Sequence, residues 1–372
     1  MIILVSANSE WNLVNYRMGL LRELLAAGHQ IYTVAPRSLH TPQLVAIGCQ
    51  CIPIPISSQG MNIFCELQLL IRYICIFAKF KPDLFLGFTI KPNIYGSIGA
   101  YICGVKIINT ITGLGSAFTG GGFNAKIVKF LYRIGLANSD LIFFQNTDDA
   151  SLFLNEKIIN ADVVRIVPGS GIDLNRFKLK HEGHQVKTAP LSFLMIARLL
   201  IDKGVLDFVK AAEIIKNNNP DVNFFLLGSF EPSSPSAIHE VEVKKWVDAA
   251  LINYLGFMED VREILSASSC IVLPSYREGV PRSLLEAGAI GIPIIATDVP
   301  GCRDVVDDGL NGFLCKPRNY IDLAEKMQLI IDLSDEDRLR MGCRGRLKVE
   351  RQFDEKVVIK YYQSAILDLS KD

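Results

Sequence analysis

The sequence predicts an α/β protein made of two doubly wound domains, each with a parallel sheet between layers of helices. Three observations support this. The chain has 372 residues, which is long for one hydrophobic core and enough for two domains of roughly 180 residues. Short apolar runs alternate with longer amphipathic stretches, the pattern of strand and helix alternation in parallel sheets. A polar run at 178–190 interrupts that alternation once.

The first domain is expected at residues 1–180. Helices are predicted by 3.6-residue periodicity at 16–27, 67–80, 93–103 and 125–137. Gly28 follows the first of these at a position that suits a helix end. The apolar runs between the helices predict strands at 2–6, 31–35, 51–54, 84–87, 106–111 and 141–144.

The second domain is expected at residues 190–350, after an interdomain linker in the polar run. Its predicted strands are 191–197, 222–227, 252–255, 270–273 and 294–296. The chain ends in helical patterns at 322–333, 336–349 and 355–369.

Composition excludes several classes of protein. Nearly half of the residues are hydrophobic and a fifth are charged, which indicates a globular chain. Residues 1–180 contain 16 Lys and Arg against 10 Asp and Glu, so this half carries +6 and the remainder −6. Because this excess is small and spread out, it favours an anionic surface or acceptor as the partner of this half, rather than nucleic acid. An equally good alternative is that the difference between the halves is ordinary variation in charge. The nine cysteines show no metal-ligand spacing and indicate reduced thiols in a cytoplasmic protein.

The first candidate site is the string EGVPRSLLE, which follows the strand at 270–273. Pro281 suits the first position of a helix, and the amides of the next three residues are expected to point unpaired at a ligand. Glu278 and Glu286 bracket this helix start with seven residues between them, and both can accept hydrogen bonds from sugar hydroxyls. The alternative is a solvated glutamate and a second one that complements the helix dipole.

The second candidate is the pair Arg198 and Lys203, which follows the strand at 191–197. Two cations five residues apart, at the carboxyl end of a strand, can converge on one diphosphate. Such a pair also arises by chance on a protein surface.

Together these strings resemble the E-x7-E and R-x4-K signatures of the retaining family-4 glycosyltransferases, whose fold is called GT-B. The resemblance implies two Rossmann-like domains that face a central cleft, with helix 355–369 crossing back to the first domain. It implies that Arg198 and Lys203 stabilise the leaving diphosphate, that Glu278 orients the donor hexose and that Glu286 binds the ribose. The donor-binding set that it implies is Gly228, Phe257, Glu278, Gly279, Val280, Pro281, Ser283 and Glu286. For Phe257 a place in the core is an equal alternative.

The first-domain candidates are weaker. Gly113 and Gly115 lie in ITGLGSAFTGGGF, a string similar to the acceptor and phosphate loop of enzymes that elongate undecaprenyl-diphosphate-linked sugars. Arg17 could reach a phosphate or lie on the surface. Many family members carry a histidine after the fourth strand; here FTIKPN has none, and Lys91 is the alternative anion contact.

The resemblance implies an enzyme, a hexosyltransferase that needs neither cofactor nor metal. No D-x-D pair follows a strand, and Asp148 with Asp149 begins a helix, where acidic residues complement the dipole. The expected function is retaining transfer of N-acetylgalactosamine from its UDP derivative to an undecaprenyl-diphosphate-linked saccharide in O-antigen or surface polysaccharide synthesis. The alternatives are another UDP-hexose, a nucleotide-sugar epimerase of similar fold and a non-catalytic nucleotide-binding protein.

The expected location is the cytoplasm, with possible peripheral contact at the inner face of the cytoplasmic membrane. Residues 67–80 are too short to span a bilayer and are interrupted by Arg72 and Lys79. With Lys81, this segment could lie in the bilayer interface, or it packs on the sheet while Arg72 reaches to water.

Overall fold

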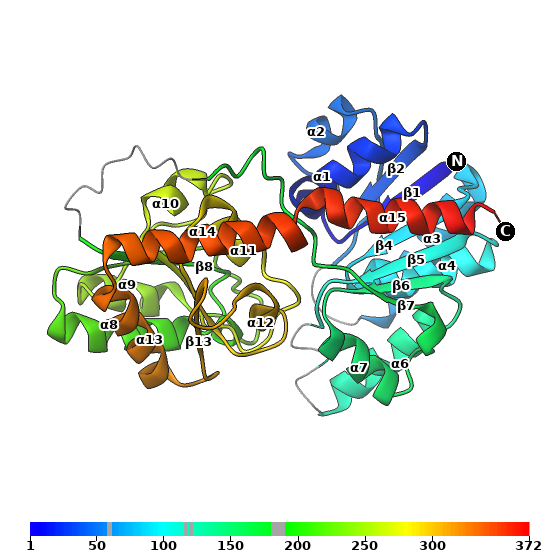
Figure 1. Ribbon diagram of the computed structural model, residues 1–372. Coiled ribbons are helices and arrows are strands. Elements are labelled where there is room, and N and C mark those ends of the chain that lie inside the picture. The colour runs from blue at the N-terminus through cyan, green and yellow to red at the C-terminus, as the bar shows by residue number, and fades with distance from the viewer. Residues whose placement is uncertain (58–61, 115–117, 119–121, 180–189, 372) are drawn as a thin grey trace. The chain divides into compact units, whose positions relative to one another are not determined.

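The computed structural model describes residues 1–57, 62–114, 118, 122–179 and 190–371. It divides into two compact units (Figure 1). Unit 1 contains Met1–Gly171 and Glu355–Asp372, and unit 2 contains Ile172–Asp354. The first segment of unit 1 therefore ends nine residues before the expected boundary at 180, because the amide of Ile172 already donates to the carbonyl of Phe353 in unit 2.

Unit 1 has a seven-stranded sheet in the order β3-β2-β1-β4-β5-β6-β7, and every pair in it is parallel. The strands are β1 (Ile2–Ser6), β2 (Gln30–Ala35), β3 (Gln50–Pro53), β4 (Leu84–Phe88), β5 (Lys106–Ile111), β6 (Leu141–Phe144) and β7 (Val164–Ile166). The sequence patterns missed β7, because its three residues lie at the sheet edge and are largely exposed.

Helices cover both faces of this sheet (Figure 1). One layer contains α1 (Glu10–Ala26), α2 (Thr41–Ala46) and α15 (Glu355–Leu369). The other contains α3 (Ile63–Phe80), the π-helical turn Pro92–Gly96, α4 (Ser97–Ile102), α6 (Gly122–Leu136) and α7 (Thr147–Asn155). The first helix begins six residues before its apolar periodicity, because Ser9 caps it by accepting the amide of Asn12.

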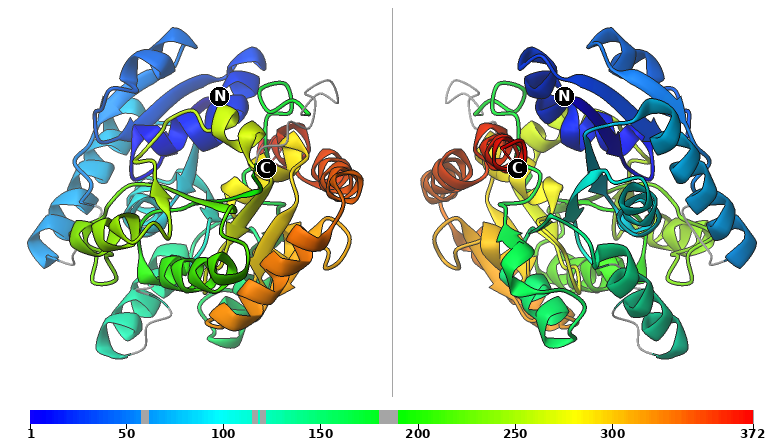
Figure 2. Two further views of the ribbon diagram at one scale, coloured as in Figure 1. Left: turned by 90° about the vertical axis from the view of Figure 1, so that its left-hand side faces the viewer. Right: turned by 90° about the vertical axis from the view of Figure 1, so that its right-hand side faces the viewer.

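Unit 2 has a six-stranded parallel sheet in the order β10-β9-β8-β11-β12-β13. Its strands are β8 (Ser192–Ile196), β9 (Asn223–Leu227), β10 (Asn253–Tyr254), β11 (Cys270–Leu273), β12 (Ile294–Thr297) and β13 (Gly312–Cys315). Its helices are α8 (Val205–Asn218), α9 (Glu240–Asp248), α10 (Arg262–Ala267), α11 (Arg282–Ile290), α12 (Cys302–Val305), α13 (Tyr320–Asp332) and α14 (Asp335–Gln352). Both views in Figure 2 show helices packed along these sheets.

The last helix, α15, belongs to unit 1 although it follows unit 2 in the sequence. Its buried side chains Val358, Tyr362 and Ile366 enter the core that α1 forms with the sheet. The Tyr362 hydroxyl is 2.8 Å from Oγ1 of Thr110 on β5, and both side chains are fully buried. A buried polar contact thus joins the C-terminal helix to the sheet of unit 1.

We predict that Tyr362→Phe lowers the free energy of unfolding by about 1–3 kcal/mol, because the Thr110 hydroxyl then loses a buried partner. Tyr361→Phe is the matched control, since the neighbouring Tyr361 is 44% exposed. Urea unfolding followed by circular dichroism measures both variants. Equal stability of the two would contradict the role given to this contact.

Candidate functional site

The two candidate strings meet where the strand order of unit 2 reverses. Strand β8 has β9 on one side and β11 on the other. Arg198 and Lys203 follow β8, and Glu278 follows β11. In an open parallel sheet, ligands bind outside the carboxyl ends of the two strands at such a point. The topology of unit 2 therefore places the candidates where this fold takes a ligand.

Lys203 and Glu278 form an ion pair. Lys203 lies at the end of a 3-10 turn (Ile201–Lys203), and its Nζ is 2.6 Å from Oε1 of Glu278, which is 75 residues away in the chain. The two side chains are 16% and 15% exposed, so both remain accessible to a ligand. Arg198 is exposed, and in the described part of the chain its side chain has no hydrogen-bonded or ion-paired partner.

Gly204 brings these two loops together. Its φ is +76°, and a Cβ there would lie 2.0 Å from the carbonyl oxygen of Pro274, the residue that follows β11. Only glycine allows both this conformation and this approach. The contact fixes the loop after β8 against the loop after β11, and so holds Lys203 beside Glu278.

The start of α11 differs from the prediction by one residue. Pro281 has a ψ of 123° and is the N-cap, so the helix begins at Arg282. The amide of Leu284, expected to be unpaired, donates to the Pro281 carbonyl at 3.2 Å. The expectation of three unpaired amides was therefore wrong for Leu284, because the extended Pro281 turns its carbonyl into the first helical turn.

Glu286 lies on the first turns of α11 and pairs with Arg282. The Nε of Arg282 is 3.3 Å from Oε1 of Glu286, and the two side chains are 16% and 15% exposed. Burial raises the pKa of the Glu286 carboxyl, while the charges of Arg282 and Arg176 act in the opposite direction. Sequence reasoning missed Arg282, although its i, i+4 spacing from Glu286 is the signal of such a pair.

A second glycine shapes the loop that carries Glu278. Gly301, with a φ of +79°, packs so closely on Gly279 that a Cβ would lie 1.4 Å from the Gly279 carbonyl oxygen. Val280, also predicted in the donor site, is 8% exposed. Gly301 therefore packs against the backbone of this loop, a contact with Gly279 that the sequence alone does not reveal.

The remaining donor-site candidates follow the outer strands. Gly228, after β9, lies where a Cβ would be 1.7 Å from the carbonyl oxygen of Ala197, so its first role is close packing of two strand ends. Phe257 follows β10 and is 56% exposed. The alternative that Phe257 belongs to the core is wrong. Ser283 is the second residue of α11 and is half-buried.

In unit 1 the two cationic candidates, Arg17 and Lys91, contact other side chains of the same unit. Arg17, on α1, is 2% exposed, and its guanidinium carbon lies 4.2 Å from the centre of the Phe88 ring. The alternative of a surface arginine is therefore wrong. Lys91 forms an ion pair with Glu66 of α3, so its charge is already matched. Gly113 has a φ of +131°, and Gly115 lies outside the described residues.

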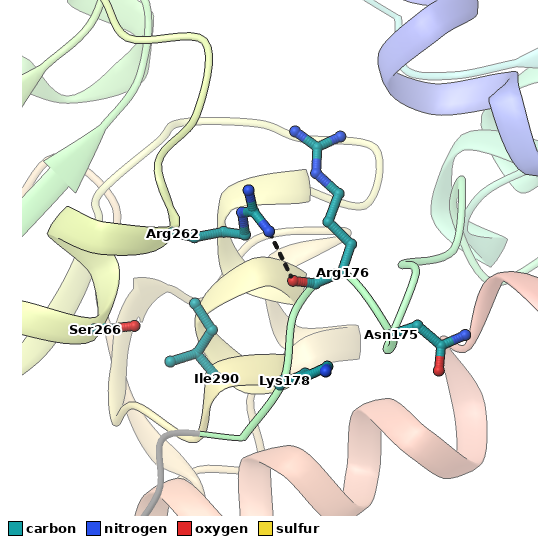
Figure 3. A pocket seen from close by; sticks show the side chains of 6 residues that line it. All are labelled: Asn175, Arg176, Lys178, Arg262, Ser266 and Ile290. Atoms are coloured by element: carbon teal, nitrogen blue, oxygen red, sulfur yellow. Dashed lines mark hydrogen bonds between the residues drawn. The ribbon is translucent and has the colours of Figure 1, made fainter. Parts of the chain in front are cut away.

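A separate pocket of about 380 Å³ lies in unit 2 (Figure 3). Arg262 donates from Nη1 to the Arg176 carbonyl oxygen at 3.5 Å along its wall. The side chains of Arg176 and Lys178 point in different directions (Figure 3). The pocket is lined by Asn175, Arg176, Lys178, Arg262, Ser266 and Ile290, and contains none of the predicted site residues.

Two further observations concern the described residues alone. No three His, Cys, Asp or Glu side chains in them gather as metal ligands. None of the helices they form combines the length and hydropathy that a bilayer crossing requires.

Two family models match this chain. The model "Glycosyl transferases group 1" matches residues 177–348, and "Glycosyl transferase 4-like" matches residues 2–146. Solved structures with the same fold include a glycosyltransferase from Rickettsia africae (TM-score 0.81, 18% identity, 100% of this chain and 99% of that one). Another is Anabaena HepE in complex with UDP and glucose (TM-score 0.76, 16% identity, 98% of each). Together the two models match most of the chain, which is a glycosyltransferase of the GT-B fold.

Two of the relatives have names that state both the transferred sugar and the undecaprenyl carrier of the acceptor. One is N,N'-diacetylbacillosaminyl-diphospho-undecaprenol alpha-1,3-N-acetylgalactosaminyltransferase of Campylobacter jejuni, 26% identical over 94% of each chain. The other is UDP-Gal:alpha-D-GlcNAc-diphosphoundecaprenol alpha-1,3-galactosyltransferase of Escherichia coli, 26% identical over 79% of this chain and 78% of that one.

We predict that Gly301→Ala weakens UDP binding and destabilises the protein more than Gly309→Ala does. Both glycines have a φ above +70°, but a Cβ at Gly309 meets no atom within 4 Å. Gly309→Ala should cost about 1–2 kcal/mol of backbone strain alone, while Gly301→Ala must also displace Gly279. Thermal unfolding and titration with UDP measure the difference. Equal UDP affinity in the two variants would show that Gly301 does not shape the site.

Proposed function

We propose that this protein is a retaining, UDP-sugar-dependent transferase that extends a saccharide carried on undecaprenyl diphosphate at the cytoplasmic face of the membrane. The observation that supports it most is the group formed by Arg198, Lys203 and Glu278 at the strand-order reversal of unit 2, beside the start of α11. Cations there suit a diphosphate, and the carboxylate suits a sugar hydroxyl.

The nucleotide is proposed to lie along the carboxyl ends of β9, β8 and β11. The carboxylate of Glu286 accepts hydrogen bonds from the ribose hydroxyls, and Arg282 fixes its orientation. The exposed ring of Phe257 is available for contact with the base. Gly228 lets the backbone approach the nucleotide closely, since no side chain intervenes.

In the proposed reaction, the bond between the anomeric carbon and the diphosphate oxygen breaks while the acceptor oxygen bonds to the same carbon from the same face. The proton of the acceptor hydroxyl passes to the departing diphosphate. Arg198 and Lys203 stabilise the negative charge that develops on this group, an electrostatic contribution. Glu278 orients the hexose and remains unmodified. When the donor binds, Lys203 exchanges part of its contact with Glu278 for phosphate oxygens.

The acceptor and the donor sugar are inferred from the named relatives. The C. jejuni and E. coli relatives both bear names of transferases that act on undecaprenyl-diphosphate-linked sugars. The C. jejuni name indicates N-acetylgalactosamine, which we propose as the donor sugar, and the E. coli name makes galactose the second candidate. Both matched models describe glycosyl transferases, so the epimerase alternative has no support from them.

The deciding experiment incubates the protein with a panel of UDP-sugars and short-chain polyprenyl-diphosphate saccharides, with magnesium or with excess EDTA. We expect an α-linked N-acetylgalactosamine product by mass and NMR, at similar rates in both conditions. A β-linked product would contradict the retaining mechanism. A loss in EDTA that magnesium restores would reveal a metal requirement, and donor binding without turnover would show a non-catalytic protein.

We predict that Arg198→Ala and Lys203→Ala each weaken UDP binding at least tenfold, since a hydrogen bond to a charged group contributes about 1.5–3 kcal/mol. Arg198→Ala should leave thermal stability unchanged, whereas Lys203→Ala also removes the partner of Glu278. Lys244→Ala, at an exposed position of α9, is the control. Calorimetric titration with UDP measures the affinities. Wild-type affinity in both variants would refute the diphosphate site.

A further inference from the structure

Helix α3 has two apolar faces, and the protein covers one of them. Leu69, Tyr73 and Phe77 point into the core of unit 1 and are at most 3% exposed. On the outward side, Phe64 is 76% exposed, Leu67 55% and Ile71 51%. These spacings of three and four residues form one stripe along the helix. In Figure 2, α3 runs along the outer surface of its unit.

The charges beside this stripe have one sign. Arg72 and Lys79 are exposed and lie seven residues apart, so both fall along one edge of the stripe. The only acidic residue of α3, Glu66, is buried and paired with Lys91. The outward face of α3 therefore combines aliphatic and aromatic side chains with cations.

The same helical layer of unit 1 repeats this combination. On α6, Phe130 is 58% exposed and Ile134 44%, near the exposed Lys126 and Arg133. No Asp or Glu occurs in α6, and Lys129 pairs with Glu156 beyond its end. Two helices that cover one face of the sheet thus expose large apolar residues among cations.

We propose that the outward face of α3, formed by Ile63, Phe64, Leu67, Ile71, Arg72 and Lys79, docks in the interface of a bilayer that contains anionic lipids. Apolar side chains enter the boundary of the acyl chains, and the cations lie among the headgroups. The charge complementarity selects this partner over an apolar protein groove. The proposal deepens the proposed function, on which it rests, because a polyprenyl-linked acceptor resides in such a bilayer.

The test is flotation of the full chain with vesicles of phosphatidylcholine, with or without phosphatidylglycerol. The wild type should bind the anionic vesicles at low salt. Phe64→Gln/Leu67→Gln/Ile71→Gln should reduce the vesicle-bound fraction at least about tenfold, and Arg72→Gln/Lys79→Gln should remove the preference for phosphatidylglycerol. The control Tyr361→Gln/Leu367→Gln alters residues of the opposite layer that are 44% and 57% exposed, and should bind like the wild type.

Three outcomes would overturn the proposal. In the first, the wild type does not float with anionic vesicles. In the second, the triple variant floats as well as the wild type. In the third, the triple variant binds vesicles normally but has a different oligomeric mass in analytical ultracentrifugation, which would assign the face to a second copy of the chain. Transfer to a short-chain, water-soluble acceptor separates this proposal from the proposed function. The triple variant should retain that activity, so loss of vesicle binding alone leaves the transferase assignment intact.

Discussion

The contact of Gly204 with the backbone of Pro274 is the constraint on which the candidate site depends. It joins the loop that leaves β8, which contains the short 3-10 turn Ile201–Lys203, to the loop that leaves β11. The approach is possible only without a side chain, and it leaves Lys203 within hydrogen-bonding distance of Glu278. Two segments that are distant in the sequence thereby form one cluster of charge.

Two ion pairs of the candidate site explain how such charges are tolerated. A half-buried cation or carboxylate without a partner costs free energy, because it loses water and gains nothing in return. Lys203 with Glu278, and Arg282 with Glu286, satisfy one another. In the proposed function, ligand binding at these positions exchanges one partner for another, which favours a ligand that carries both phosphate oxygens and hydroxyls.

Much of the fold followed from sequence periodicity. Most strands of the two sheets are buried apolar runs, so their positions and the two-unit architecture were predictable, whereas β7 and β13 were not. Both lie at the edge of a sheet, and β7 has largely exposed residues. The helix at 93–103 begins instead with a π-helical turn at Pro92–Gly96, a detail that periodicity does not encode.

The candidate site was predictable where motif spacing follows from topology, as for Arg198, Lys203 and Glu278. It was not predictable where a partner comes from elsewhere in the fold. The neighbours of Arg17 and Lys91 are Phe88 and Glu66, and only the packing of α1 on the sheet and of α3 on the π-helical turn reveals them. Gly301 likewise has a role only through the backbone of Gly279.

The placement of α15 has a consequence for synthesis on the ribosome. Unit 2 is continuous in the sequence, so all of its residues are present once Asp354 has been added. Unit 1 starts before unit 2 in the sequence, yet its core lacks Val358, Tyr362 and Ile366 until α15 has been synthesised. The domain that starts first is therefore completed last, and the nascent chain exposes the apolar surface under α15 while unit 2 is made.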